Sequence, residues 1–119
     1  MRDFRTLVVW EKAHRLTLSI YKATKNFPGN EMYGLISQMR RASVSIPTNI
    51  AEGCGRDGDN ELARYLQIAM GSASELEYHL LLAKDLGFLN ESIYAQLHDN
   101  VTEVKRMLAT FIQKLRQKD

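Results

Sequence analysis

Acidic and histidine side chains are the residues of this sequence whose types could carry acid–base chemistry. Glu52 and Glu75 are candidates for a carboxylate pair in which one raised pKa separates an acid from a base. If the chain forms a helical hairpin about position 57 or 58, about twelve residues of helix, or about 18 Å, separate these two carboxylates. That distance is too long for joint catalysis, and the same register puts a basic residue beside each carboxylate, which lowers its pKa. We therefore expect no catalytic pair.

Metal-binding spacings are present only in part. A di-metal site in a helix bundle needs Glu-x-x-His twice, together with two further inward-facing glutamates. Glu11 and His14 have this spacing once, but Glu11 lies opposite the apolar side of its helix. Glu75 and His79 are four residues apart, and Glu77 and His79 are two apart. We expect no metal, no cofactor and no catalytic residue.

The other reactive residue types also favour a protein that is not an enzyme. Cys54 is the single cysteine, which excludes an intrachain disulfide, and we expect it to be a small buried side chain. The three histidines form no triad with a serine in a nucleophile turn. The glycines of residues 53–58 follow no strand, unlike those of a phosphate loop. An uncharacterised enzyme using polar residues near Pro47 is the third and weakest of our function hypotheses.

Basic side chains form two groups that could contact phosphates without reading bases. Residues 1–27 carry six basic and two acidic side chains, a net +4, whereas residues 59–87 carry two basic and five acidic ones, a net −3. The net charge of +2 does not by itself indicate nucleic-acid binding. Solubility, and pairing between helices of opposite charge, are the alternatives. The candidate contacts are Lys12, Arg15, Lys22, Lys25, Lys114, Arg116 and Lys118.

Four amphipathic segments position these residues, each with apolar side chains at spacings of three and four. The first ends before Pro28, the second begins near Asn30 as N-cap, the third ends at Gly87, and the fourth begins after Asn90. The stripes are Ala13, Leu16, Ile20, Ala23 and Phe27; Leu35, Met39, Ala42, Ile46 and Asn49 or Ile50; Leu62, Leu66, Ala69, Ala73, Leu76 and Leu80; and Leu97, Val101, Val104, Leu108, Phe111 and Leu115. We predict one all-α domain over 1–119, an up-down-up-down antiparallel four-helix bundle.

The third segment is more apolar than one stripe requires. Six further apolar residues widen its stripe to much of the circumference, which indicates cover by another subunit. The alternative is that they only broaden the core of the single chain. These residues are Tyr65, Ile68, Met70, Tyr78, Leu81 and Leu82.

The stretch SIPTNIAEG, residues 45–53, places a proline inside the second helix. A proline there removes a hydrogen bond and predicts a kink. The hairpin register puts Ser43 near Ser72 and predicts two ion pairs, Glu52 with Arg64 and Arg40 or Arg41 with Glu75. Asn49 is expected to bond backbone freed by the kink. The predicted polar network is Arg40, Arg41, Ser45, Pro47, Asn49, Glu52, Arg64, Ser72 and Glu75.

The sequence carries no sign of a membrane or export function. No run approaches the about 18 apolar residues of a membrane span. The first ten residues, MRDFRTLVVW, are too short and too charged for a signal peptide. We expect a cytoplasmic protein.

Three stretches, FRTLVVWEKAHRL, NFPGNEMYGLISQMRRASVSIPTNIAEGCGR and YLQIAMGSASELEYHLLLAKDLGFL, closely resemble the 23S rRNA intervening-sequence protein family. The ordered pattern of RRA, SIP, NIAEG and GS-x-x-ELE is specific, and the match spans nearly the whole chain. The residues that carry the pattern are Arg40, Arg41, Ser45, Pro47, Asn49, Glu52, Gly53, Gly71, Ser72 and Glu75.

This resemblance implies a four-helix bundle that assembles into a ring-like homopentamer. It also implies an association with insertions in ribosomal RNA genes, a loose link to ribosomal proteins, and no established catalytic activity. A similar bundle is the accessory protein of diversity-generating retroelements, whose basic pentamer binds nucleic acid and a reverse transcriptase. We therefore expect an oligomeric binding or scaffold protein with RNA or a ribonucleoprotein as partner. The alternative is an assembly module that binds another protein and no nucleic acid.

Overall fold

The computed structural model describes residues 2–117, and within this range it is all helical. The four long helices are α1 (Val8–Thr24), α2 (Leu35–Cys54), α3 (Asp59–Asp85) and α4 (Glu91–Arg116). Two 3₁₀ turns, η1 (Phe4–Thr6) and η2 (Gly29–Glu31), precede α1 and α2. The all-helical bundle predicted from the sequence is confirmed.

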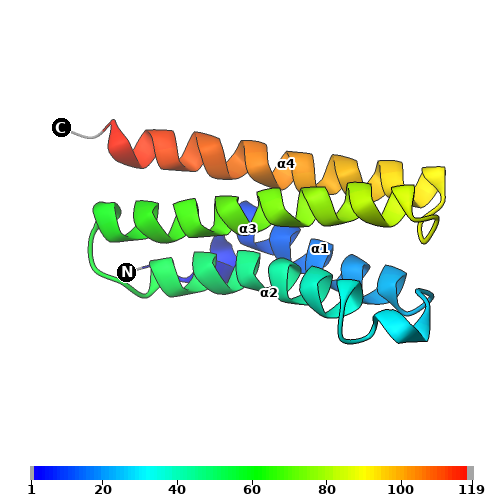
Figure 1. Ribbon diagram of the computed structural model, residues 1–119. Coiled ribbons are helices and arrows are strands. Elements are labelled where there is room, and N and C mark those ends of the chain that lie inside the picture. The colour runs from blue at the N-terminus through cyan, green and yellow to red at the C-terminus, as the bar shows by residue number, and fades with distance from the viewer. Residues whose placement is uncertain (1, 118–119) are drawn as a thin grey trace.

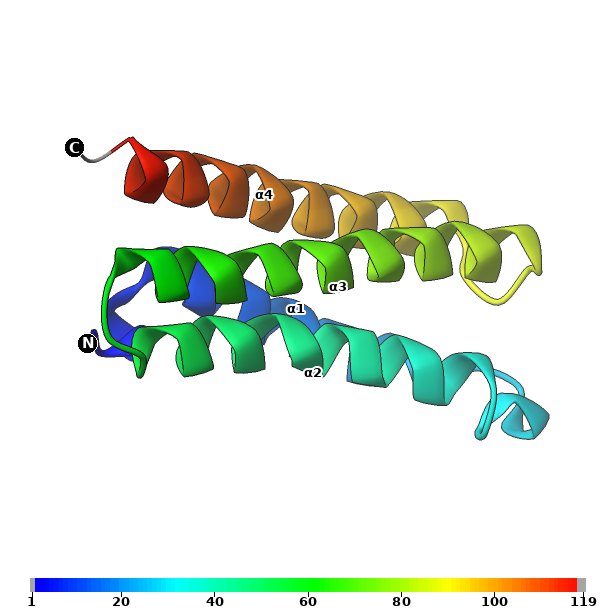
Figure 2. The same ribbon diagram turned by 60° about the vertical axis from the view of Figure 1, so that its left-hand side comes forward.

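The four helices pack side by side in an elongated molecule (Figures 1 and 2). Each helix contacts its neighbours in the sequence, and α1 also contacts α4, which places α1 diagonally opposite α3. In both views the chain reverses direction at each connection. The principal extents are 49 × 23 × 20 Å, so the bundle is about twice as long as it is wide.

The core is built from the four predicted stripes. Ile50, rather than Asn49, completes the stripe of α2 and is fully buried. On α4, Ile112 is buried whereas Phe111 is only partly covered, so the stripe moves by one residue near the end of the helix. Ala23 likewise packs at the edge of the core. The remaining stripe residues are buried as predicted.

Two helix boundaries follow their predicted capping residues closely. Gly87 has φ of +82° after the last turn of α3 and donates its N–H to Lys84 O at 2.9 Å. Phe88 N–H donates to Ala83 O at 2.9 Å, which completes a Schellman motif. The Asn90 side chain accepts from Ile93 N–H at 2.8 Å and caps α4.

The predicted start of α2 is wrong. Residues 29–31, which include Asn30, form the η2 turn, and α2 begins only at Leu35. The first turn of α2 is capped instead by Glu31, whose Oε1 accepts from Leu35 N–H at 3.2 Å.

Pro47 lies inside α2, which continues as one helix on both sides of it. Because proline has no N–H, the carbonyl four residues earlier, that of Ser43, loses its helical donor. Thr17 of α1 supplies the missing donor, since its Oγ1 lies 2.9 Å from Ser43 O and 3.1 Å from Ala13 O. A bond between helices therefore replaces the bond that the proline removes, and a kink at Pro47 stays a prediction.

The extra apolar residues of α3 divide between the core and the surface. Tyr65 is buried and accepts a hydrogen bond from Arg56 at 2.9 Å. Ile68, Tyr78 and Leu81 are exposed, and Tyr78 keeps 59% of its surface in solvent. Within this chain the apolar surface of α3 is therefore only partly covered.

None of the helices in the described range is both long and apolar enough to cross a membrane.

Candidate nucleic-acid interface

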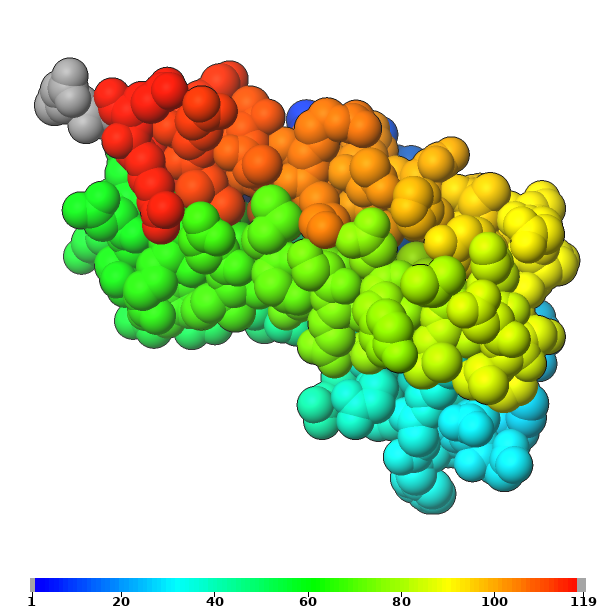
Figure 3. Space-filling model, turned by 45° about the horizontal axis from the view of Figure 1, so that its top comes forward, coloured from blue at the N-terminus to red at the C-terminus, as the bar shows by residue number. Residues whose placement is uncertain are grey.

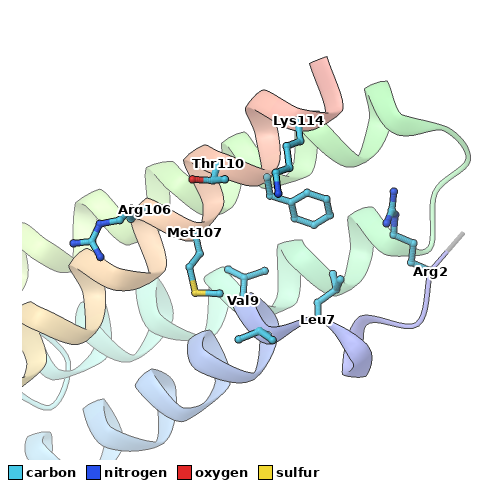
Figure 4. A pocket seen from close by; sticks show the side chains of 9 residues that line it. Arg2, Leu7, Val9, Arg106, Met107, Thr110 and Lys114 are labelled. Carbon is cyan, nitrogen blue, oxygen red and sulfur yellow. The ribbon is translucent and has the colours of Figure 1, made fainter. Parts of the chain in front are cut away.

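A cavity of about 460 Å³ lies between the start of α1 and the end of α4 (Figure 4). Its apolar lining comes from both elements, and in Figure 4 the Met107 side chain points from α4 toward Val9. Three cationic side chains, Arg2, Arg106 and Lys114, line the same cavity. The apolar lining residues are Leu7, Val8, Val9, Met107 and Phe111.

The three cations around this cavity differ in whether they have an ion-pair partner. Arg2 forms an ion pair with Asp59 at 3.7 Å, and its guanidinium lies 5.6 Å from the centre of the Phe111 ring. Its backbone N–H donates to Cys54 O at 2.9 Å, which fixes the start of the chain to the end of α2. Within residues 2–117, Arg106 and Lys114 form no ion pair, and no carboxylate lines the cavity. This cavity therefore combines an apolar floor with a positive rim.

A second, smaller hollow extends the same side of the bundle toward the other end. It has a volume of about 270 Å³ and is lined by Lys22 of α1 together with Ile93 and Gln96 of α4. We call Arg2, Lys22, Arg106 and Lys114 the α1–α4 cationic face. Arg116 lies outside it, in a hollow shared by α4 and α3.

Some of the side chains predicted to contact nucleic acid already have an ion-pair partner, whereas others do not. Lys12 pairs with Glu103 of α4 at 3.3 Å, and Arg15 pairs with Glu11 at 3.4 Å. For Lys22, Lys25, Lys114 and Arg116, the described part of the chain offers no ion pair. Lys118 lies outside the described residues. Contact between any of these side chains and nucleic acid stays a prediction.

The ion pairs predicted across the α2–α3 hairpin are wrong. Glu52 pairs with Arg56 at 3.5 Å, and Arg64 pairs with Glu61 at 3.0 Å. Each charged group finds its partner within the same short segment of chain, three or four residues away, where helical neighbours lie closest.

The Arg40 and Arg41 side chains also do not reach Glu75. Arg40 donates to Thr24 Oγ1 at 2.9 Å, and Glu75 lies 3.4 Å from His79 Nε2. Arg41 is exposed and has no ion pair among residues 2–117.

A smaller polar contact does join α2 and α3. Ser45 Oγ and Ser72 Oγ lie 2.8 Å apart, so Ser72 faces Ser45 rather than the predicted Ser43. Asn49 Nδ2 donates to Ser45 O at 2.8 Å and to Ser45 Oγ at 3.0 Å. The amide of Asn49 thus bonds the carbonyl of Ser45, while the carbonyl freed by Pro47 is bonded by Thr17.

Histidine and acidic side chains of the described residues meet in two places, His79 with Glu75 at 3.4 Å and His98 with Glu77 at 3.7 Å. No three histidine, cysteine or acidic side chains within residues 2–117 cluster closely enough to hold a metal. Burial lowers the pKa of His79, which the nearby Glu75 carboxylate partly offsets. Cys54 is buried as predicted, and that burial raises the pKa of its thiol and keeps it protonated.

Comparisons with known proteins identify a similar solved structure and a matching sequence family. A search of curated proteins finds no match. A solved structure from Bacteroides thetaiotaomicron VPI-5482, described as a protein of unknown function from the S23 ribosomal protein family, superimposes with a TM-score of 0.80. It is 26% identical, and the match covers 88% of this chain and 98% of that one. The model of the 23S rRNA-intervening sequence protein family matches residues 5–110, so the chain belongs to that family.

Proposed function

We propose that this protein is a non-enzymatic homo-oligomer that binds RNA, alone or in a ribonucleoprotein, through the phosphates. The observation that carries the proposal is the α1–α4 cationic face. Arg106 and Lys114 there have no carboxylate partner within residues 2–117, and no acidic side chain lines the cavity beside them. Unpaired cations can displace the counterions of a phosphate chain without first breaking an ion pair, which favours binding.

The distribution of charge over the helices also favours the α1–α4 side of the bundle as the side that binds phosphates. Helix α1 carries three basic and one acidic residue, a net +2, and α4 carries four basic and three acidic ones, a net +1. Helix α3 carries two basic and five acidic residues, a net −3. Because α1 lies diagonally opposite α3, a phosphate chain is attracted to one side of the molecule and repelled by the other.

Fluorescence polarisation with labelled single-stranded RNA, at two salt concentrations, tests this proposal. We expect affinity to fall as salt rises, because bound cations release counterions from RNA. The double variant Arg106→Gln/Lys114→Gln removes two contacts and should reduce the slope of log K against log salt by about 1.4.

The matched control is Lys12→Gln/Arg15→Gln, which removes the same charge from side chains already paired with Glu103 and Glu11. It should weaken binding less than the Arg106/Lys114 variant. Binding that is absent or independent of salt would refute the RNA proposal.

A protein–protein assembly module is the second candidate function, and one residue of α3 favours assembly. At Gly53 a Cβ would lie 2.8 Å from Tyr65 Cβ, so the fold of the chain itself requires a glycine there. At Gly71 a Cβ would meet nothing within 4 Å, although glycine inside a helix costs about 1 kcal/mol relative to alanine. Nothing within the single chain requires glycine at position 71, whereas the close approach of a second chain would require it.

The exposed residues around Gly71 fit the same interpretation. Ile68 and Tyr78 are exposed on α3 three and seven residues away, on the surface that the helix presents away from the core. We propose that a second copy of the chain packs here, and that repetition of this contact closes a ring, as the expected homopentamer requires.

A further inference from the structure

A groove with a volume of about 660 Å³ follows the outer surface of α2 and is bordered by Tyr21 of α1. We call it the α2 groove. Its lining combines two tyrosines, two arginines and three apolar side chains with small hydroxyl residues, and no acidic residue of the described chain contributes to it. The tyrosines, arginines and apolar residues are Tyr21, Met32, Tyr33, Ile36, Arg40, Arg41 and Val44.

Tyr33 lines the α2 groove and is almost fully exposed. It precedes α2 in the connection from α1, and 97% of its surface is exposed. The space-filling view shows this part of the chain, coloured cyan, projecting beyond the body formed by α3 and α4 (Figure 3). An aromatic ring that is exposed on both faces makes no contribution to this chain's core, but it is available for a planar group to stack on.

The two arginines of the α2 groove differ in how they are held. Arg40 donates from Nε to Thr24 Oγ1 at 2.9 Å and from Nη2 to Tyr21 O at 3.4 Å, and its guanidinium lies 4.7 Å from the centre of the Tyr21 ring. These contacts fix a positive charge in place without neutralising it. Arg41 is exposed and has no ion pair in the described residues, so its guanidinium can reach a ligand in solvent.

The geometry points to the α2 groove as a site for single-stranded nucleic acid, with an unstacked base on Tyr33 and a phosphate on Arg41. This inference rests on the proposed function and adds a second contact of a different kind. Proteins that bind single strands without sequence preference combine cations, which bind the phosphate backbone, with exposed aromatic rings, on which the bases stack. Arg40 stacked on Tyr21 adds a fixed charge to the same groove, and Lys25, the C-cap residue of α1, follows Tyr21 by four residues.

Charge and lining favour a nucleic acid over another protein as the occupant. The groove offers guanidinium groups that have no carboxylate partner, which a phosphate chain complements directly. Of its three apolar residues Ile36 is buried, and the exposed Met32 and Val44 are separated by Arg40, so they do not form the continuous apolar stripe that an amphipathic helix of a partner needs.

Comparing two oligonucleotides of the same length and charge tests the inference. One is an oligonucleotide with bases, prepared as RNA and as DNA, and the other is its abasic counterpart. Fluorescence polarisation on the full chain should show Tyr33→Ala weakening the base-containing strand about tenfold, as expected for one lost stacked base. The abasic strand should be bound equally by both proteins.

Two matched variants separate stacking from charge. Tyr33→Phe keeps the ring and should keep wild-type affinity. Arg41→Gln should weaken both strands and reduce the salt slope by about 0.7, because one phosphate contact is lost. Similar results with RNA and DNA would identify a general single-strand site, whereas an effect confined to RNA would show that the ribose contributes.

Two results would overturn this inference and leave the α1–α4 cationic face as the binding site. In the first, Tyr33→Ala binds the base-containing strand as tightly as wild type does, while Arg106→Gln/Lys114→Gln weakens it. In the second, Tyr33→Ala dissociates the oligomer in light scattering, which identifies a second copy of the chain as the occupant. If no variant and no wild-type protein binds either strand, the proposed function fails together with this inference.

Discussion

At the scale of single residues, the bond between Thr17 and Ser43 explains how a proline is tolerated inside α2. The Ser43 carbonyl is buried and has lost its helical donor to Pro47, and the Thr17 hydroxyl 2.9 Å away replaces that donor. An unpaired buried carbonyl costs about 1–3 kcal/mol, so Thr17 offsets much of the cost of the proline. Thr17 is therefore part of the contact between α1 and α2, and nothing in the 45–53 stretch alone could have identified it.

A double-mutant cycle tests the coupling of Thr17 to Pro47. Thr17→Val should lower the free energy of unfolding by about 1–3 kcal/mol, because the Ser43 carbonyl becomes unpaired. In a Pro47→Ala background the helix regains its own N–H donor, and Thr17→Val should cost at least about 1 kcal/mol less. Urea denaturation of the four proteins measures this, and additive effects would show that the two residues act independently.

His79 should make folding sensitive to pH. It is 8% exposed on α3, and its Nδ1 is buried without a hydrogen-bond partner. Burial lowers its pKa below the usual value of about 6.5, so the unfolded chain takes up the proton first as pH falls. The stabilising effect of the neutral ring is complete above that usual value and is lost as pH falls toward the lower, folded pKa.

Chemical denaturation between pH 8 and pH 5 checks the role of His79. The free energy of unfolding should fall on the acid side, with a contribution of at most about 1.4 kcal/mol per pH unit from this one proton. His79→Leu should flatten the curve in that range, while His14→Leu, at an exposed position of α1, should not. Equal slopes in wild type and His79→Leu would rule out His79 as the cause.

The errors of prediction at this scale have a common origin. Ser72 faces Ser45 and not Ser43, and a shift of two residues turns a helix by about 200° and moves side chains to the opposite side. Charged residues meanwhile took partners one helical turn away, as Arg56 does with Glu52. Spacings of three and four in the sequence could have predicted those local pairs, whereas the α2–α3 register depends on packing between helices.

At the scale of elements, the helices were predictable where the sequence contains both a stripe and a capping residue. Asn90 accepts a hydrogen bond from Ile93 N–H, and Gly87 adopts positive φ, as their residue types indicate. Asn30 misled the prediction because residues 29–31 form a 3₁₀ turn and Glu31 supplies the capping carboxylate for α2. Asparagine is common in both caps and turns, so its type alone does not distinguish them.

Gly87→Ala should destabilise the protein by about 1–2 kcal/mol, because a Cβ is unfavourable at φ of +82° in the left-handed region. Thermal unfolding followed by circular dichroism measures the change. Gly29→Ala is the matched control, since a Cβ there also meets nothing within 4 Å but φ is not positive, and it should leave stability unchanged or raise it by about 0.4–1 kcal/mol. A stable Gly87→Ala variant would show that the Schellman motif does not hold the end of α3.

At the scale of the whole molecule, the feature with the widest consequence is the surface of α3 around Gly71. Amphipathic patterning indicated surplus apolar residues on α3, and the structure shows Ile68, Tyr78 and Leu81 exposed. The sequence pattern does not show which of these surplus residues the single chain buries. Tyr65 is buried and bonded by Arg56, from the turn between α2 and α3, whereas Tyr78 on the same helix is exposed. The sequence indicates that α3 has more apolar residues than one stripe requires, whereas packing in the folded chain determines which of them are exposed.

Light scattering at micromolar concentration tests the proposed assembly. Wild type should be an oligomer, and Gly71→Leu should shift it toward monomer because the new side chain prevents close approach of a second chain. Ala109→Leu adds a similar side chain at an exposed position of α4 and should leave the oligomer intact. A wild-type monomer, or an oligomer unaffected by Gly71→Leu, would exclude α3 as the contact surface.

The bond between Thr17 and Ser43 also constrains how this sequence can diverge. A descendant that first loses the proline at position 47 regains a backbone donor, and position 17 then becomes free to change to an apolar residue. A descendant that first loses the hydroxyl at position 17 leaves a buried carbonyl unpaired and is disfavoured by selection. Substitution at the two positions should therefore be ordered in evolution, with proline leaving before threonine.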